Sequence, residues 1–186
     1  MAITLKDGLC TFGSQEIVEV PPSCPVAASG DIASTNHSTQ KAPLGVLLRF
    51  KGNVYRYVLV NAVSVAAAAG GVVHWHDLDP ENGIFEVCTE YALRMGVTDG
   101  KNLLAGILGC AVTHGYYTWI QVGGVALLAK VNTSTDTGDV MIYSTSDLTF
   151  GRCAADAAVT GIPYGVALDE DHVSGFAPVL LLNMIW

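Results

Sequence analysis

Charged side chains are scarce in this chain. Only 14% of its 186 residues are Asp, Glu, Lys or Arg, whereas an average soluble domain has about 25%. Long surface helices need Lys, Glu and Arg to fill their solvent-facing side, so this scarcity disfavours a helical fold. It also indicates that part of the surface is covered by other protein.

Basic residues are the rarest of the charged ones. Nine Lys and Arg stand against 17 Asp and Glu, which gives a formal net charge of −8. Binding to DNA, RNA or an anionic membrane requires clustered basic side chains that neutralise phosphates, and no such run exists here. The longest apolar stretch, residues 58–73, is interrupted by Asn61 and Ser64 and predicts a strand, a loop and a second strand. We therefore expect no nucleic acid and no membrane among the partners.

The motifs of common enzymes and redox proteins are also missing. There is no Cys-x-x-Cys pair, no Gly-x-Ser-x-Gly and no phosphate-binding loop. Residues 96–101 superficially resemble such a loop, but its first spacing is one residue short and Asn102 follows Lys101. We expect no enzymatic activity, no cofactor and five reduced, mostly buried thiols in a protein made in a cytosol. The five cysteines are Cys10, Cys24, Cys88, Cys110 and Cys153.

Two histidines and three carboxylates lie close together in the sequence and allow two interpretations. His74 and His76 point to one face if they lie on a strand, and Asp77, Asp79 and Glu81 follow. Such ligand types bind metals, but no third distant ligand is identified, and Pro80 departs from the calcium-loop pattern. We expect an exposed polar loop at a strand end and no metal, with ligand binding by residues 74–81 left open.

The chain divides into two parts of different texture. Residues 1–45 contain four of the seven prolines and no lasting periodicity, and we interpret them as an extended N-terminal arm. Residues 46–186 form the expected β-domain. The arm contains one short extended apolar piece, which we expect to dock on a neighbouring surface and not to remain a disordered terminus. This piece and the prolines that stop it are Ile17, Val18, Val20, Pro21 and Pro22.

The β-domain is expected to be all-β, a compact sandwich or barrel, with a jelly-roll-like arrangement possible. Apolar, β-branched and aromatic runs separated by Gly and Asn predict short strands. For residues 103–112 the apolar content also suits a helix, although Gly106 and Gly109 weaken that interpretation. The loop is expected at 77–83. The expected strands are 46–50, 54–60, 72–75, 84–91, 116–122, 125–131, 140–143, 164–168 and 179–186.

The aromatic residues point to packing. Tyr116, Tyr117 and Trp119 lie at strand spacing beside Ile120, which indicates core or subunit interface in preference to stacking on sugars or bases. Trp186, at the end of a run of apolar residues, predicts a packed C-terminal strand.

Several segments resemble a known family of structural proteins. They are the run Gly115-Tyr116-Tyr117-Thr118-Trp119-Ile120-Gln121-Val122-Gly123-Gly124, then Thr137-Gly138-Asp139-Val140, then Ile162-Pro163-Tyr164-Gly165-Val166-Ala167-Leu168, then a closing strand. Their order is similar to that in capsid decoration (cement) proteins of tailed bacteriophages and related head or tail-fibre modules. The resemblance covers residues 44–186 and includes no active site.

The resemblance implies a structural virion protein, made in the host cytoplasm, on the capsid surface. Its partners would be the major capsid protein and its own copies, commonly as a homotrimer that bridges capsomers by several weak contacts. The alternative is a head-fibre or tail-fibre module that binds a host surface glycan through exposed aromatics and residues 74–81. From composition and packing, the residues expected to contact the capsid or another subunit are Ile17, Val18, Val20, Pro21, Pro22, Tyr116, Tyr117, Trp119 and Trp186.

Overall fold

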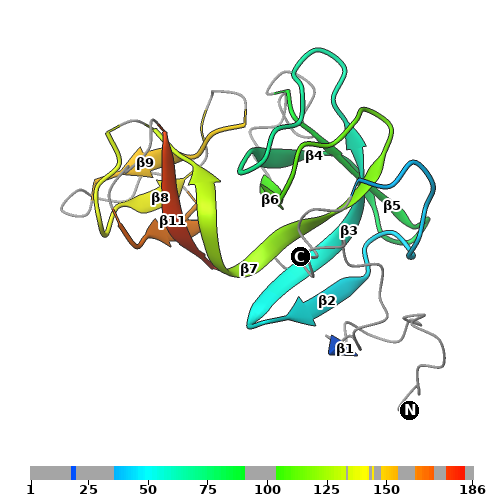
Figure 1. The fold of residues 1–186 in the computed structure, drawn as a ribbon, viewed down its shortest axis with the longest axis horizontal. Coiled ribbons are helices and arrows are strands. Elements are labelled where there is room, and N and C mark those ends of the chain that lie inside the picture. Colours follow the sequence, from blue (N-terminus) through cyan, green and yellow to red (C-terminus); the bar gives the residue numbers. More distant parts are fainter. Residues whose placement is uncertain are drawn as a thin grey trace.

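The structure is a computed structural model that describes residues 18–19 (backbone only), 36–90, 104–132, 134–142, 144, 148–154, 162–169 and 175–182. These residues form eleven strands and no helix (Figure 1), so the expected all-β class is confirmed. The strands are β1 (Val18–Glu19), β2 (Leu47–Phe50), β3 (Asn53–Asn61), β4 (Val72–Asp79), β5 (Ile84–Cys88), β6 (Leu104–Leu108), β7 (Tyr117–Lys130), β8 (Val140–Ile142), β9 (Gly151–Cys153), β10 (Gly165–Ala167) and β11 (Phe176–Leu181).

Five of these strands close into a barrel. The order is β3, β5, β4, β6 and β7, and β7 returns to pair with β3. The β3–β5 pair is parallel and the other four pairs are antiparallel. Alternate residues of β3 point inward, so Val54, Val58 and Val60 share the core with Ile120 and Val122 of β7. Of the two expected architectures, a sandwich or a barrel, the structure contains the barrel.

A second layer covers part of the barrel wall. Strand β2 pairs antiparallel with β3, and the residues before it run back across β3 and β7. There the backbone of His37 exchanges two hydrogen bonds with that of Tyr117 at 2.9 Å each. On its other edge β2 pairs in parallel with β1, with Val18 opposite Leu48. Residues 36–45, which the sequence assigned to the arm, therefore lie on the barrel of their own chain.

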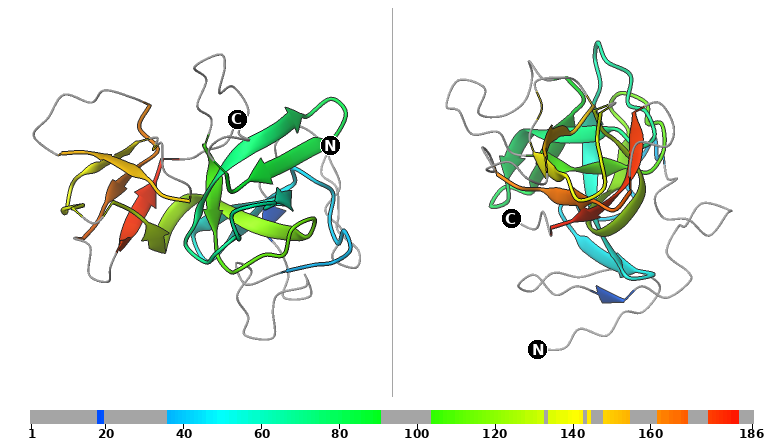
Figure 2. Two further views of the ribbon diagram at one scale, coloured as in Figure 1. Left: turned by 90° about the horizontal axis from the view of Figure 1, so that it is seen from above. Right: turned by 90° about the vertical axis from the view of Figure 1, so that its left-hand side faces the viewer.

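Strand β7 extends beyond the barrel into a second unit. Its first half pairs with β3 as far as Gly123, and its second half pairs with β11 from Gly124 onward. Figure 1 shows β7 running from the barrel on the right to the smaller unit on the left, and the view from above in Figure 2 separates the same two units. The sequence predicted two strands interrupted at this Gly-Gly pair. In the structure the strand is continuous, because Gly124 at φ 84° redirects the backbone without breaking the pairing.

The second unit is a small antiparallel sheet in the order β7, β11, β10, β8 and β9. An isolated bridge between Val131 and Phe150 joins its last strand back to the end of β7. Its inner face continues the same hydrophobic core, with Met141, Phe150 and Val179 fully buried. The three-residue strand β9 was not predicted, because Gly151–Cys153 is too short to give a periodic signal.

Two local expectations are resolved by neighbouring strands. Residues 104–108 form strand β6 and not a helix, and a Cβ added at Gly106 would lie only 2.6 Å from the backbone oxygen of Gln121 on β7. Residues 77–79, expected in a loop, continue β4 and pair with β5, so that the loop shrinks to residues 80–83. In both places tertiary pairing decides the conformation.

Candidate interaction surfaces

An aromatic cluster lies on the outside of the barrel beneath the covering layer. The ring of Tyr57 on β3 lies 5.0 Å from that of Trp119 and 6.2 Å from that of Tyr117, both on β7. These side chains alternate with the inward-facing ones on the same strands. Leu48 of β2 and Val46 pack over them, so Tyr57 is fully buried and Trp119 is 2% exposed. The cluster is a second, smaller core.

A chain of hydrogen bonds joins this cluster to the covering segment. The backbone N–H of Lys41 donates to the Tyr57 hydroxyl at 3.1 Å, and that hydroxyl lies 2.9 Å from Nδ1 of His37. The hydroxyl and Nδ1 share this hydrogen bond in a direction that the imidazole tautomer sets. Burial, and to a lesser extent the charge of Lys41, lower the pKa of His37. The covering segment is therefore held by a neutral histidine.

The aromatic residues expected at an interface are thus used mostly inside the chain. Trp119 lies in the small core, Tyr117 is half-buried at its margin, and Tyr116 packs on the main core from the opposite side of the strand. Val18 lies on β1, beside the edge of β2. The other expected contact residues lie outside the described part of the chain: Ile17, Val20, Pro21, Pro22 and Trp186.

The histidine and carboxylate group is spread over a strand and a turn. His74 is fully buried, whereas His76 lies at a bulge, with its Nε2 3.8 Å from Oε1 of Glu86. Asp79 accepts hydrogen bonds from the side chain and backbone of Asn82, which lower its pKa and close the β4–β5 turn. Within the described ranges, no three His, Cys, Asp or Glu side chains are grouped as metal ligands. Glu81 is exposed, as expected of the loop.

A buried arginine was missed at the sequence level. Arg56 is 2% exposed, and its guanidinium carbon lies 5.6 Å from the ring of Trp75 and 5.9 Å from that of Phe85. Burial lowers its pKa to about 10. The signal was present, because Arg56 alternates in step with Val54 and Val58, which face the core. Because arginine side chains are mostly exposed in proteins, the charge of Arg56 argues against this buried position.

A thiol in the barrel is similarly enclosed. Cys88 at the end of β5 is fully buried, and desolvation raises its pKa to about 12. Such a cysteine stays a thiol and is a poor nucleophile. Cys153 is also buried and Cys110 half-buried, while Cys10 and Cys24 lie outside the described residues.

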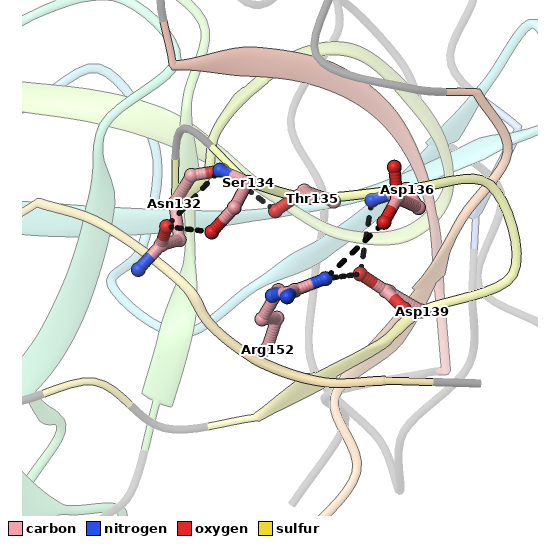
Figure 3. A network of polar contacts seen from close by, with 6 residues as sticks. All are labelled: Asn132, Ser134, Thr135, Asp136, Asp139 and Arg152. Atoms are coloured by element: carbon pink, nitrogen blue, oxygen red, sulfur yellow. Dashed lines mark hydrogen bonds and ion pairs between the residues drawn. The ribbon is translucent and has the colours of Figure 1, made fainter. Parts of the chain in front are cut away.

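The Thr137-Gly138-Asp139 segment of the resemblance belongs to a hydrogen-bonded group in the second unit. We call this group the clasp and define it as residues 136–139 with Arg152. Asp139 is buried, and its Oδ2 accepts hydrogen bonds from the backbone of Asp136 and from Nη1 of Arg152, each at 2.9 Å (Figure 3). The bond to Asp139 is the main cause that raises the pKa of Arg152. Figure 3 also shows Asn132 accepting hydrogen bonds from the backbone and hydroxyl of Ser134, which shape the preceding turn.

The same clasp contacts the other motif of the resemblance. The N–H of Gly138 donates to the carbonyl of Ala167, and the N–H of Ala167 donates to the carbonyl of Asp139, each at 2.9 Å. Gly165 is needed for close approach, because a Cβ there would lie 2.7 Å from Cγ1 of Val179. These motif residues hold the second unit together.

The outer face of the second unit carries exposed leucines. Leu127 and Leu128 of β7 are 74% and 66% exposed, and Leu180 of β11 points the same way. We call this surface the leucine face and define it by five residues. They are Leu127, Leu128, Leu168, Leu180 and Leu182.

No family model, no curated protein and no solved structure matches this chain. Across the described part of the chain, no helix is long and apolar enough to cross a membrane.

Proposed function

We propose that this protein is a structural component of a bacteriophage virion that binds the outside of the capsid as an oligomer and stabilises the junctions between capsomers. The observation that carries the proposal is the leucine face, an apolar surface that stays exposed among the described residues, whose two hydrophobic clusters are buried. A surface of this kind marks a site of protein association. An oligomer formed through such a surface presents several shell contacts at once, which gives avidity without one large interface.

Strand β1 of the arm pairs with the edge of β2 in its own chain, and the same kind of pairing is open to a sheet edge of another chain. The edge of β2 accepts the extended segment β1 in parallel pairing, through Val18 opposite Leu48 and Glu19 opposite Arg49. Addition of a strand to an exposed sheet edge is a common way for one chain to bind another. We propose that the arm reaches the shell and adds to the attachment.

A glycan-binding fibre module has less support. Such a module would use exposed aromatic rings and residues 74–81, but His74, Trp75 and Trp119 are buried. Buried rings offer no stacking face to a sugar.

The proposal is tested with expanded capsids of the encoding phage from which this protein has been stripped. Purified chain is added, the shells are sedimented, and bound copies are located by cryo-electron microscopy. We expect density at every equivalent capsomer junction and a higher shell melting temperature. Copies confined to fibres at a few vertices would favour the fibre module, and a failure to bind would overturn both.

The arm is tested by deleting residues 1–35. This cut leaves His37 and its contacts with Tyr57 and Tyr117 in place, so the barrel stays covered. We expect the truncated chain to fold and to bind shells much more weakly. Equal binding by the truncated and full chains would place the shell contact on the β-domain.

A further inference from the structure

The strands beneath the leucine face are apolar on both sides. Residues 125–129 of β7 and 176–182 in and after β11 contain no charged or hydrogen-bonding side chain. Ala126, Ala129 and Val179 point into the core, while Val125 and Leu180 point outward. Strands that are apolar on both faces are typical of sheets buried on both faces. The sequence is therefore that of a sheet covered on both sides, whereas the described residues cover one side of it.

Strand register gathers the outward residues into one surface. Val125 of β7, Leu180 of β11 and Val166 of β10 lie opposite one another in a row across three strands. In the next row, Leu168 donates its N–H to the carbonyl of Pro178 at 2.8 Å. On β7, the strand that pairs with β11, a bulge places two residues, Leu127 and Leu128, opposite the single residue Pro178. Both leucines are exposed there. The leucines thus form one continuous face and are not scattered.

The size of this face matches the centre of a stable interface. Added together, the exposed parts of its five leucines equal the surface of more than two and a half fully exposed leucines. A leucine is somewhat smaller than an aromatic side chain, which buries 150–250 Å², so the five expose on the order of 400 Å². A stable interface buries about 800 Å² per partner, with an apolar centre and a polar rim. Half-buried Val125, Val166 and Pro178 border the leucines and add to the area.

We propose that the leucine face is covered by the leucine face or an adjoining surface of a second copy of this chain, and that it is the interface of a homo-oligomer. This inference rests on the proposed function, which requires an oligomer, and it identifies the surface through which the copies associate. An apolar face of about 400 Å² is comparable to the largest patch of a typical monomer, which is often a contact site, and other copies of the same chain are present wherever it folds. The absence of charge on the face also suits a chain of net charge −8, since two copies can meet here with their carboxylates elsewhere.

The test measures mass in solution by light scattering at micromolar concentration. We expect the wild-type chain to have the mass of two or more 19.5 kDa chains. Leu128→Glu and Leu180→Glu should reduce it to that of one chain, because each places a charge in the apolar interface. Val63→Glu is the matched control: Val63 is 64% exposed on the barrel unit, and its variant should keep the wild-type mass. If a glutamate variant fails to fold, as judged by circular dichroism, the double variant Leu127→Gln with Leu128→Gln replaces it.

The outcomes separate this inference from the proposed function. A wild-type monomer, or leucine variants that keep the wild-type mass, would overturn the inference whatever the shells bind. An oligomer that the leucine variants dissociate, with no wild-type binding to shells, would support the inference and reject the proposed function. A wild-type monomer whose shell binding is lost in Leu128→Glu would assign the face to the capsid protein and overturn the self-association.

Discussion

The two units of this chain differ in what covers their outer surfaces. The barrel has aromatic residues on its outside, Tyr57, Tyr117 and Trp119, and residues 36–50 of the same chain pack over them. The second unit has leucines on its outside, and the described residues leave Leu127 and Leu128 mostly exposed. Both outer faces are apolar in sequence, yet within the described ranges only the face of the barrel is covered by another segment of the chain. Apolar composition therefore identifies a face that needs cover, while the topology decides whether the cover comes from the same chain.

The sharpest test of this difference removes one side chain from each outer face. Trp119→Ala deletes a buried ring beneath the covering segment and should lower the free energy of unfolding by about 3–5 kcal/mol. Leu128→Ala removes an exposed side chain and should change the stability of the single chain by less than about 0.5 kcal/mol. Denaturant unfolding of both variants checks this. It is done at dilutions where mass measurement finds single chains, so that loss of association does not add to the effect.

Equal losses in the two variants would contradict the comparison. They would mean either that the aromatic cluster is loosely packed or that Leu128 is buried within its own chain.

The junction between the two units provides the second test. Gly124→Ala places a side chain at φ 84°, and its Cβ would lie 2.3 Å from Oδ1 and 2.9 Å from Cα of Asn53. We expect a loss of about 1–3 kcal/mol from the backbone conformation and a similar further loss from the overlap. Gly83→Ala is the control, because Gly83 has φ 71° but an added Cβ there would contact nothing within 4 Å. Equal loss in both would mean that β7 can move away from Asn53.

The clasp of the second unit gives a smaller effect. Asp139→Ala leaves the N–H of Asp136 without its acceptor and removes the closer of the two carboxylates that accept from Arg152, and we expect a loss of about 1–3 kcal/mol in thermal or denaturant unfolding. Asp136→Ala removes a mostly exposed carboxylate 3.4 Å from the same guanidinium and should cost less than about 0.5 kcal/mol. A reversed order would assign the clasp to the Asp136 side chain.

The sequence predicted local structure well and three-dimensional pairing poorly. Alternation and turn residues predicted most strands, because both are local properties of the chain, as in the run that became β3. The path of β7 through Gly124 and the short strand β9 were missed, since each depends on partners distant in sequence. Barrel closure was expected only as one of two architectures, because it depends on the pairing of β3 with β7.

The candidate surfaces divide in the same way. Sequence recognised that Tyr117 and Trp119 pack, but the identity of their cover, the segment that begins at Asn36, required coordinates. The leucines of β7 and β11 were read as ordinary strand residues, because alternation does not reveal which faces remain open. The expected contacts on the arm and at Trp186 stay predictions.

The smallest expected effect concerns pH and the covering segment. The pKa of His37 is lowered in the folded chain, so below its ordinary value of 6.5 the unfolded chain binds more protons than the folded one. Stability should therefore be at its full value above pH 6.5 and decrease as the pH falls toward 5, because the unfolded chain takes up the histidine proton before the folded chain does. His37→Gln should reduce this decrease. His114→Gln is the control for histidine removal, because His114 lies in an exposed loop of the barrel and its Nδ1 accepts a hydrogen bond from the N–H of Ala62. The measurement is the unfolding midpoint of both variants and the wild type between pH 7.5 and pH 5, a window that includes the ordinary histidine pKa of 6.5. A wild-type profile that rises as the pH falls, or one that His37→Gln leaves unchanged, would mean that the covering segment is not held by a neutral histidine.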